Sequence, residues 1–413
     1  MKENKSLRSI TCVATNHGKA GSMRKQPLCC AAIFVLALAV ALPSQAQGFD
    51  VLHEFTGLDG ALPEGALVRD AAGNLYGTTF AGGVGEGTVY KTTSTGETTV
   101  LLTLNGLNGE HPASALIQDQ ANNLYGTADG GPGDAGVVFK LSPAGEQTTL
   151  FSFPRGVDHS PRGPTGSLLM DRSGNLFGTT LIGGNGSCQF GCGTIYRLDS
   201  AGKLHVQHAF TGGADGNQPS GPLVRDANGD LYGVARFGGN LACPEYPQAG
   251  CGTVFKLARN GQLTVLHTFK GGKDGATPQP GLLLDAAGNL YGATASGGTS
   301  ENGTVFQISR NRKYTIRHRF TGEDGKTPNG GLVIDPAGTI FGATQAGGAD
   351  ALGTVFAMSS SGTVKVLHAF TGDLDGAFPL AGLIRDAAGN LYGTAVKNFL
   401  TNQVDGDVFR ITP

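Results

Sequence analysis

Short apolar segments separated by glycine-rich turns recur along most of the chain. In residues 281–320, an apolar run at 281–284 is followed by a polar turn and a second run at 289–294, and then by a Gly-Gly loop and runs at 303–308 and 314–320. Short runs rich in Val, Leu, Thr, Tyr and Phe and bounded by Gly, Asp and Asn are typical of β-strands. None has the length or the 3.6-residue period of a helix. The pattern predicts four strands in each such unit.

The unit occurs seven times. Anchored on the strand that ends each unit, the copies begin at Val51, Val100, Leu150, Val206, Val265, Ile316 and Val366. A single four-stranded sheet cannot bury both of its faces, so the copies must pack against one another. Seven four-stranded antiparallel sheets at this spacing predict an all-β fold, a seven-bladed β-propeller.

The two ends of the repeat region predict how the ring closes. The region opens on residues 51–55, a fourth strand that has no preceding three, and it finishes on residues 407–411, a third strand without a fourth. Pairing these segments completes the last blade and removes two exposed sheet edges. We therefore expect residues 47–413 to form one propeller domain.

Residues present in every copy are expected to serve the fold. Five equivalent histidines in the fourth strand are too far apart on a ring to act together; they are His53, His208, His267, His318 and His368. An aspartate precedes a Gly or Asn in the turn between strands one and two of each copy: Asp70, Asp119, Asp171, Asp226, Asp285, Asp335 and Asp386. Aspartate at this place suits an Asx-type turn.

Residues 1–46 differ from the repeats. A short basic segment from Met23 leads into an apolar run at 29–42, followed by Pro43 and the small residues of 44–46. This order predicts a secretory signal peptide preceded by an N-terminal extension, and no membrane span after its removal. Residues 47–413 carry 24 Lys and Arg against 31 Asp and Glu. An acidic, secreted monomer is expected, with no nucleic-acid partner.

Four cysteines remain after the signal peptide: Cys188, Cys192, Cys243 and Cys251. An even number in an exported chain predicts disulfides. Three pairings are possible, and the local one is favoured because Cys192 and Cys251 hold the same repeat position and each has a nearby upstream partner. Four thiolates binding zinc is the competing interpretation.

Residues that break the repeat are the better candidates for function. The loops between strands two and three vary between copies, and variable loops on a rigid scaffold commonly carry binding. Most of them contain an acid: Glu86, Asp134, Glu245, Glu301, Asp350 and Asp405. No cofactor is predicted, but a ring of carboxylates could hold Ca²⁺ or meet a cationic or hydroxyl-rich ligand. The favoured interpretation of these acids is a solvated rim.

The third and fourth copies depart furthest from the repeat. The fourth carries Arg236, Glu245 and Tyr246 in or beside its cysteine-bounded loop, and the third carries Asp158 and His159 before its first strand. These five residues are the predicted ligand-binding candidates. The alternative is that both loops have a purely structural role.

Enzyme signatures are missing from the sequence. There is no Gly-x-Ser-x-Gly, no His-Glu-x-x-His and no phosphate-cradling Gly-x-x-x-x-Gly-Lys-Ser/Thr, and no carboxylate pair stands out for glycoside hydrolysis. No catalytic residue is therefore predicted. Three functions remain open: a binding scaffold for a polysaccharide or another exported protein, a carbohydrate-active hydrolase or lyase with a site over the central channel, and a structural envelope protein.

The repeated motif resembles a known family. Gly-Asn-Leu-Tyr-Gly-Thr-Thr at 73–79, Gly-Thr-Val-Phe-Lys-Leu at 252–257 and Val-Leu-His-x-Phe at 265–269 resemble the GloVer tandem-repeat family of exported bacterial proteins, over residues 50–413. The resemblance implies an exported repeat protein without an established activity. The Asp-x-x-Gly-Asn-Leu-Tyr portion is also similar to the turn of NHL-type propellers.

Overall fold

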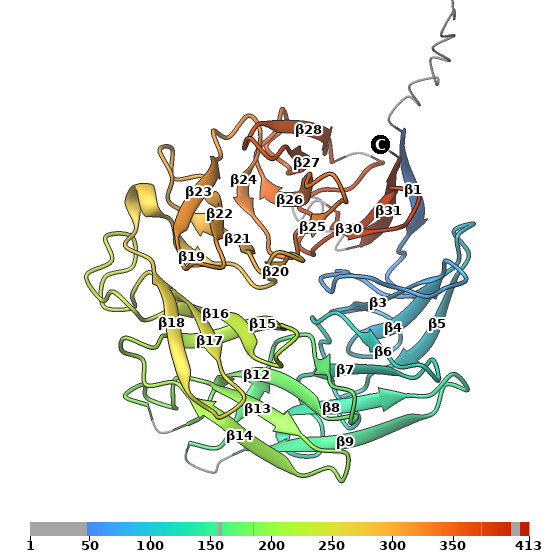
Figure 1. The fold of residues 1–413 in the computed structure, drawn as a ribbon. Helices are drawn as coiled ribbons and strands as arrows, with labels where there is room; N and C mark the ends of the chain where they lie inside the picture. Colours follow the sequence, from blue (N-terminus) through green and yellow to red (C-terminus); the bar gives the residue numbers. More distant parts are fainter. Residues whose placement is uncertain (1–47, 156–158, 185, 373, 398–404, 413) are drawn as a thin grey trace, which may run out of the picture. The chain divides into compact units, whose positions relative to one another are not determined.

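The computed structural model describes residues 48–155, 159–184, 186–372, 374–397 and 405–412. These residues form seven antiparallel sheets arranged as blades in a ring (Figure 1). The predicted signal peptide and Asp158 lie outside the described residues. The propeller falls within the compact unit Gln45–Pro413, and its one helix among the described residues is the 3-10 helix η1 (Gly272–Asp274). The predicted fold class is confirmed.

Blades 1 to 3 follow one another along the chain. Blade 1 contains β2 (Val68–Arg69), β3 (Leu75–Thr79), β4 (Thr88–Thr92) and β5 (Thr98–Thr103). Blade 2 contains β6 (Ile117–Gln118), β7 (Leu124–Ala128), β8 (Asp134–Leu141) and β9 (Gln147–Pro154). Blade 3 contains β10 (Arg162–Pro164), β11 (Leu169–Met170), β12 (Leu176–Ile182), β13 (Thr194–Leu198) and β14 (Leu204–Ala209).

Blades 4 to 6 repeat the arrangement. Blade 4 contains β15 (Asn217–Arg225), β16 (Leu231–Phe237), β17 (Thr253–Leu257) and β18 (Leu263–Thr268). Blade 5 contains β19 (Ala276–Pro278), β20 (Leu283–Leu284), β21 (Leu290–Ser296), β22 (Thr304–Ile308) and β23 (Tyr314–Arg319). Blade 6 contains β24 (Lys326–Pro328), β25 (Val333–Ile334), β26 (Ile340–Ala346), β27 (Thr354–Met358) and β28 (Val364–Ala369).

Blade 7 is built from both ends of the propeller, as predicted. It contains β29 (Ile384–Arg385), β30 (Leu391–Val396), β31 (Gly406–Thr412) and β1 (Gly48–Glu54). Strand β1 pairs with β31 from Gly48 opposite Thr412 to Glu54 opposite Asp407 (Figure 1). The Arg410 guanidinium donates to the Asp50 carboxylate at 2.7 Å across this pair. The ring is therefore closed by backbone hydrogen bonds and an ion pair.

The inner strand is shorter than the sequence pattern suggested in every blade except blade 4, where β15 runs over 9 residues. In blades 3, 5 and 6 it is split into two short pieces that pair with the same second strand. The cause is the close approach of neighbouring blades at the centre of the ring. A Cβ atom on Gly330 would lie 1.1 Å from the carbonyl oxygen of Pro280, so the backbone of one blade fills the space where an inner side chain would stand.

The core lies between the blades. Seven buried clusters each combine residues of two adjacent blades. Their largest members are fully buried aromatics at repeated positions of the third and fourth strands: Phe55, Tyr90, Phe139, Phe153, Tyr196, Phe210, Phe255, Phe269, Phe306, Phe320, Phe356 and Phe370. Burying one such ring contributes roughly 1.5–3 kcal/mol, so packing against both neighbours holds each sheet in place.

The repeated polar residues are structural, as predicted. A β-bulge recurs in every outer strand, where the register shifts between the third and fourth strands, and bulges re-aim side chains. Next to it, His53 contacts Asp59 at 2.7 Å, and His318 contacts Asp324 at the same distance. The other three histidines pair in the same way. In the turns, Asp70 accepts from the backbone and side-chain nitrogens of Asn74.

Blade 7 departs from the repeat at one buried position. In blades 1, 4 and 6 a threonine that begins the third strand donates to the backbone oxygen of the Asp-Gly turn, as Thr354 does to Asp324. In blade 7 this position is Asp407, which is buried and whose two carboxylate oxygens have no hydrogen-bond partner in the described structure. Burial raises the pKa of Asp407 to about 7; the positive charge of Lys397 acts to lower it, and the negative charges of Asp375 and Asp405 act to raise it.

We predict that Asp407→Thr raises the free energy of unfolding at pH 8 and changes that free energy little at pH 4. Because the pKa is higher in the folded than in the unfolded chain, the native state binds the proton more tightly, and stability falls as the pH rises from about 4 to about 7. Urea unfolding should show the wild type losing roughly 2–4 kcal/mol over this range, and the variant losing less.

Asp350→Asn, which removes an exposed loop carboxylate, is the matched control and should leave the dependence of stability on pH unchanged. Parallel profiles for the wild type and Asp407→Thr would contradict this account of the closing blade.

Candidate functional site

The antiparallel blades give the ring two different faces. Loops between strands two and three and the connections between blades lie at one end of the strands, which we call the connection face. Turns between strands one and two and between strands three and four lie at the other end, the turn face. All predicted candidate residues that the structure describes lie on the connection face or at its rim.

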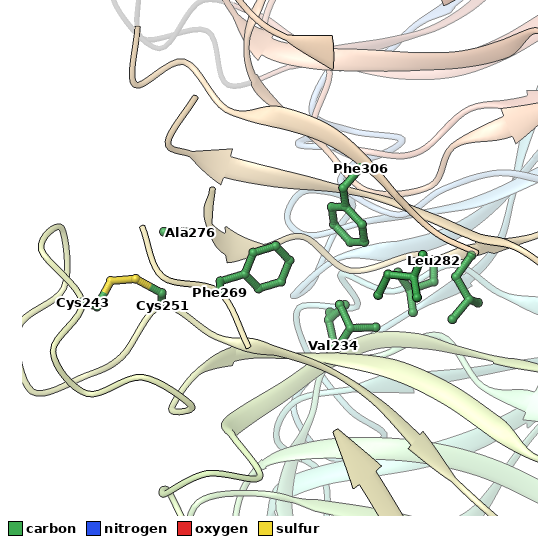
Figure 2. Packing of buried hydrophobic residues seen from close by; sticks show 10 residues of the cluster. Val234, Cys243, Cys251, Phe269, Ala276, Leu282 and Phe306 are labelled. Atoms are coloured by element: carbon green, nitrogen blue, oxygen red, sulfur yellow. A yellow bond between two sulfur atoms is a disulfide. The ribbon is translucent and has the colours of Figure 1, made fainter. Parts of the chain in front are cut away.

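Two disulfides fix the lengthened loops of blades 3 and 4. Cys188 bonds to Cys192 and Cys243 bonds to Cys251, with Cα atoms 5.2 and 5.3 Å apart. The predicted local pairing is confirmed. The zinc interpretation was wrong, because the sulfur atoms are bonded to each other. Figure 2 shows Cys243 and Cys251 beside Phe269, where the loop meets the core between blades 4 and 5.

Glu245 and Tyr246 hold the blade 4 loop against blade 5. One carboxylate oxygen of Glu245 accepts a hydrogen bond from the backbone nitrogen of Gly272 in η1, and the other lies 3.5 Å from the Cys243 sulfur. The Tyr246 hydroxyl is 3.5 Å from the Ser296 hydroxyl in β21. Both side chains therefore have structural partners on the next blade, and their binding role remains a prediction.

Arg236 and His159 are exposed. The Arg236 guanidinium lies 5.3 Å from the ring centre of Phe237 on the outer part of β16. His159 has φ 61°, a conformation that its equivalents Gly57 and Gly106 adopt in other connections. Its Nδ1 donates to the Gly184 carbonyl oxygen at 2.9 Å, and the Gly184 nitrogen donates back to its carbonyl. A side chain in a strained backbone position, fixed by two bonds, is a feature of functional surfaces.

Two exposed hydrophobic residues accompany His159 and Arg236: Phe190 lies inside the loop that Cys188 and Cys192 close, and Leu241 lies two residues before Cys243. Both side chains are about half exposed, and the Arg162 guanidinium lies 5.2 Å from the Phe190 ring centre. We call His159, Phe190, Arg236 and Leu241 the disulfide-anchored surface. His159 and Phe190 belong to blade 3, and Arg236 and Leu241 to blade 4, so the two predicted loops lie on neighbouring blades of one face.

The acids predicted to bind Ca²⁺ lie on separate blades. Glu86 faces His111 at 3.3 Å, and Asp134 forms an ion pair with Arg155. Glu301 and Asp350 are exposed, and Asp405 is half-buried near Asp407. Within the described ranges, one group of three possible ligands gathers within 4.8 Å, and it is Cys243, Glu245 and Cys251. Its sulfurs form the disulfide, so Ca²⁺ binding by the acidic loops stays an untested prediction.

A feature that the sequence did not single out is the apolar character of the connection face. Eight large hydrophobic side chains are exposed among the described residues. Two of them lie on outer strands, Val51 and Val206, and the other six on loops of the connection face: Leu58, Val84, Leu107, Phe190, Leu241 and Leu374. The sequence contains a signal for this surface: Leu58, Leu107 and Leu374 each directly precede the Asp or Asn of the turn that leads into the next blade, where a polar residue is expected.

The centre of the ring offers one acid, Glu64, beside the inner strand of blade 1. Its partial burial raises the pKa of the carboxyl group. The equivalent positions in the other blades carry no carboxylate: they are Ala113, Thr165, Ser220, Gln279, Asn329 and Leu380. A hydrolase site over the channel needs two carboxylates, and the repeat supplies no second one at this position.

Comparisons with known proteins agree with the repeat. The family described as Gloeobacter/Verrucomicrobia repeat matches residues 37–243 and 241–413. No curated protein matches the chain. In the part of the chain that the structure describes, no helix has the length and apolar character needed to cross a membrane.

Several solved structures share the fold. An extracellular domain of a protein regarded as a one-component system from B. thetaiotaomicron is 10% identical with a TM-score of 0.54, covering 87% of this chain and 39% of that one. A protein regarded as a gluconolactonase is 14% identical, with a TM-score of 0.42 and coverages of 89% and 92%. Regucalcin from Agrobacterium tumefaciens is 15% identical, with a TM-score of 0.44 and coverages of 88% and 93%. At these identities the likeness shows the fold alone.

We predict that removing the Cys243–Cys251 disulfide by Cys243→Ser with Cys251→Ser lowers the free energy of unfolding by about 2–3 kcal/mol. The bond closes a loop with a sequence separation of 8 residues, and loop-closure entropy gives this magnitude. Urea unfolding measures the loss. The Cys188–Cys192 disulfide closes a shorter loop, so the matched double variant that removes it should lose slightly less free energy of unfolding. No loss of stability in either variant would contradict a structural role for the disulfides.

Proposed function

We propose that this chain, which belongs to the Gloeobacter/Verrucomicrobia repeat family, is an exported scaffold that binds another exported protein through its connection face. The observation that carries the proposal is the placement of exposed apolar side chains on that face. Single exposed leucines are ordinary, whereas apolar residues gathered on one face mark interaction surfaces.

Four of these side chains follow one another around the ring. Leu374, Leu58 and Leu107 occupy the same position in three successive connections, into blades 7, 1 and 2, and Val84 lies in the loop of blade 1. Their exposed fractions are 82%, 79%, 80% and 92%. We call them the apolar arc. Side chains this exposed add nothing to the core of the propeller, and each would contribute roughly 1.5–3 kcal/mol if a partner buried it.

The turns that present the arc are fixed by the fold. Asp59, directly after Leu58, accepts hydrogen bonds from Thr56 and contacts His53. Asp375, directly after Leu374, contacts His368 at 2.9 Å and accepts from Thr371. Burial alone would raise the pKa of Asp59, but its hydrogen bonds with Thr56 and His53 hold that pKa below its ordinary value. A preorganised turn loses little entropy on binding, which favours recognition.

Export is supported by two independent features. Residues 23–46 carry the predicted signal peptide, and the two disulfides form and persist in oxidising compartments outside the cytoplasm. A purely structural envelope protein would need no exposed apolar arc, so the arc favours a partner-binding role over that alternative. A protein partner suits the arc better than a polysaccharide, because leucine and valine offer no hydrogen bonds to sugar hydroxyls.

We predict that a photo-crosslinking amino acid placed at Leu58 or Leu107 yields a defined protein adduct with the exported proteins of the source organism. The same amino acid at Val206, an exposed apolar residue on outer strand β14, is the matched control. Leu58→Asp combined with Leu374→Asp should lower the adduct yield from Leu107 at least tenfold, because charges replace apolar contacts. Mass spectrometry identifies the adduct.

Two results would overturn the proposal. Equal adducts from Val206 and Leu107 would indicate nonspecific contact, and an adduct digested by glycosidases but not by proteases would assign this face to a polysaccharide.

A further inference from the structure

The turn face holds cavities between adjacent blades, away from the loops of the connection face. They measure about 470 Å³ between blades 1 and 2, about 480 Å³ between blades 3 and 4, and about 580 Å³ between blades 4 and 5. Each is open to solvent and is bordered by the aspartate turns of two neighbouring blades and by the turn between strands three and four of the second blade. Because the same geometry recurs, the hollow itself is a property of the fold.

The charge of these cavities is not repeated. Lys91 is the one cation that lines the cavity between blades 1 and 2. Pro143 occupies the wall there, at the position where blades 4 and 5 carry Arg259 and Arg310. Six arginines line the other two cavities, and we call them the arginine groove: Arg172, Arg197, Arg225, Arg259, Arg310 and Arg312.

The acids that border the arginine groove are already engaged by their own turns. Asp226 accepts from the backbone nitrogens of Asn228 and Asp230 and from the Tyr232 hydroxyl. Asp285 is bound in the same way by its turn. Lys256, which also lines the groove, is neutralised by Asp230 at 2.6 Å. The carboxylates therefore have little capacity left for the arginines.

Several guanidinium donors in the groove are unused. The Arg197 Nε is buried and has no hydrogen-bond partner in the described structure. The side chains of Arg172 and Arg312 form no ion pair with the described residues. A buried donor without a partner is destabilising, so a ligand that supplies an acceptor here gains by pairing with it.

Two of the arginines are positioned by glycines of their own blades. A Cβ atom on Gly229 would lie 2.9 Å from Cδ of Arg259, and one on Gly288 would lie 3.6 Å from Cδ of Arg310. Both glycines have positive φ, 88° and 84°. The stems of the two arginines therefore cross the aspartate turns at equivalent places. This sets two guanidinium groups at the corresponding edges of neighbouring cavities.

The two cavities share one wall, the turn of blade 4, and for that reason we call them the joined cavities. Both are lined by Arg225, Asp226, Ala227 and Asn228. We propose that the arginine groove binds a linear anionic polysaccharide whose successive sugars carry carboxylate or sulfate groups. Planar guanidinium groups match both anions with paired hydrogen bonds, and each cavity has a volume typical of small-ligand pockets.

A polysaccharide fits the groove better than a nucleic acid does. Residues 47–413 carry seven more acids than bases, and the arginines are confined to blades 3 to 5. A nucleic acid needs a long basic track for its phosphates, whereas a short run of anionic sugars needs only the joined cavities. This surface is on the face opposite to the apolar arc, so the inference is independent of the proposed protein partner.

The test measures the affinity of the purified protein for polygalacturonate and for dextran sulfate, with neutral dextran as the uncharged polymer. We expect binding of at least one anionic polymer and none of dextran. Arg259→Gln combined with Arg310→Gln should weaken that binding at least tenfold. Lys91→Gln, in the equivalent cavity between blades 1 and 2, is the matched control and should leave the affinity unchanged.

The two anionic polymers assign the ligand chemistry, since preference for polygalacturonate indicates carboxylate and preference for dextran sulfate indicates sulfate. Absence of binding to both polymers would overturn the inference. An equal loss in Lys91→Gln would do so too, because it would mean general charge attraction. Unfolding by urea should be the same for all variants, which separates lost binding from lost folding. Crosslinking at Leu58 is unaffected by either outcome.

Discussion

The packing of each blade against two neighbours is the constraint on which the rest of the structure depends. No blade has a core of its own, because the buried clusters combine residues from adjacent sheets. Phe55 shows this dependence well: it follows β1 of blade 7 and packs with Leu67 and Tyr90 of blade 1. The ring must therefore close for its last interface to form, and the pairing of β1 with β31 closes it. The same packing explains glycines such as Gly330 at the centre of the ring, because a residue without a side chain lets the backbones of neighbouring blades touch.

The repeat assigns most polar residues to the scaffold. In five of the blades a histidine beside the bulge binds the aspartate of the next connection, and the turn aspartates hold the first hairpin of the blade. Because these groups have partners inside the blade, they are poor candidates for chemistry, although histidine and aspartate are common catalytic residues. Chemistry must instead be sought where the repeat changes, as at Asp407, where a carboxylate replaces a threonine and has no partner in the described structure.

The two faces of the ring differ in the kind of ligand they suit. The connection face presents apolar side chains on turns that hydrogen bonds hold in place, together with the disulfide-anchored surface of blades 3 and 4. The turn face presents arginines in joined cavities between blades 3, 4 and 5. A rigid ring with an apolar surface on one side and a basic groove on the other could hold a protein and an anionic polymer at once, without the two competing for space.

The sequence determined the features that are local or periodic. The number of blades, the closure by the first strand and the pairing of Cys188 with Cys192 and Cys243 with Cys251 all follow from spacing along the chain, and the structure confirms them. Only the tertiary structure decided what non-local packing controls. Leu58 is exposed and Leu67 is buried, although both are leucines in one connection, because the neighbouring blade covers only the second. Glu245, predicted as a ligand residue, is held by Gly272 of the next blade. Arg197 and Arg310, far apart in sequence, line joined cavities because the ring places their blades on either side of blade 4.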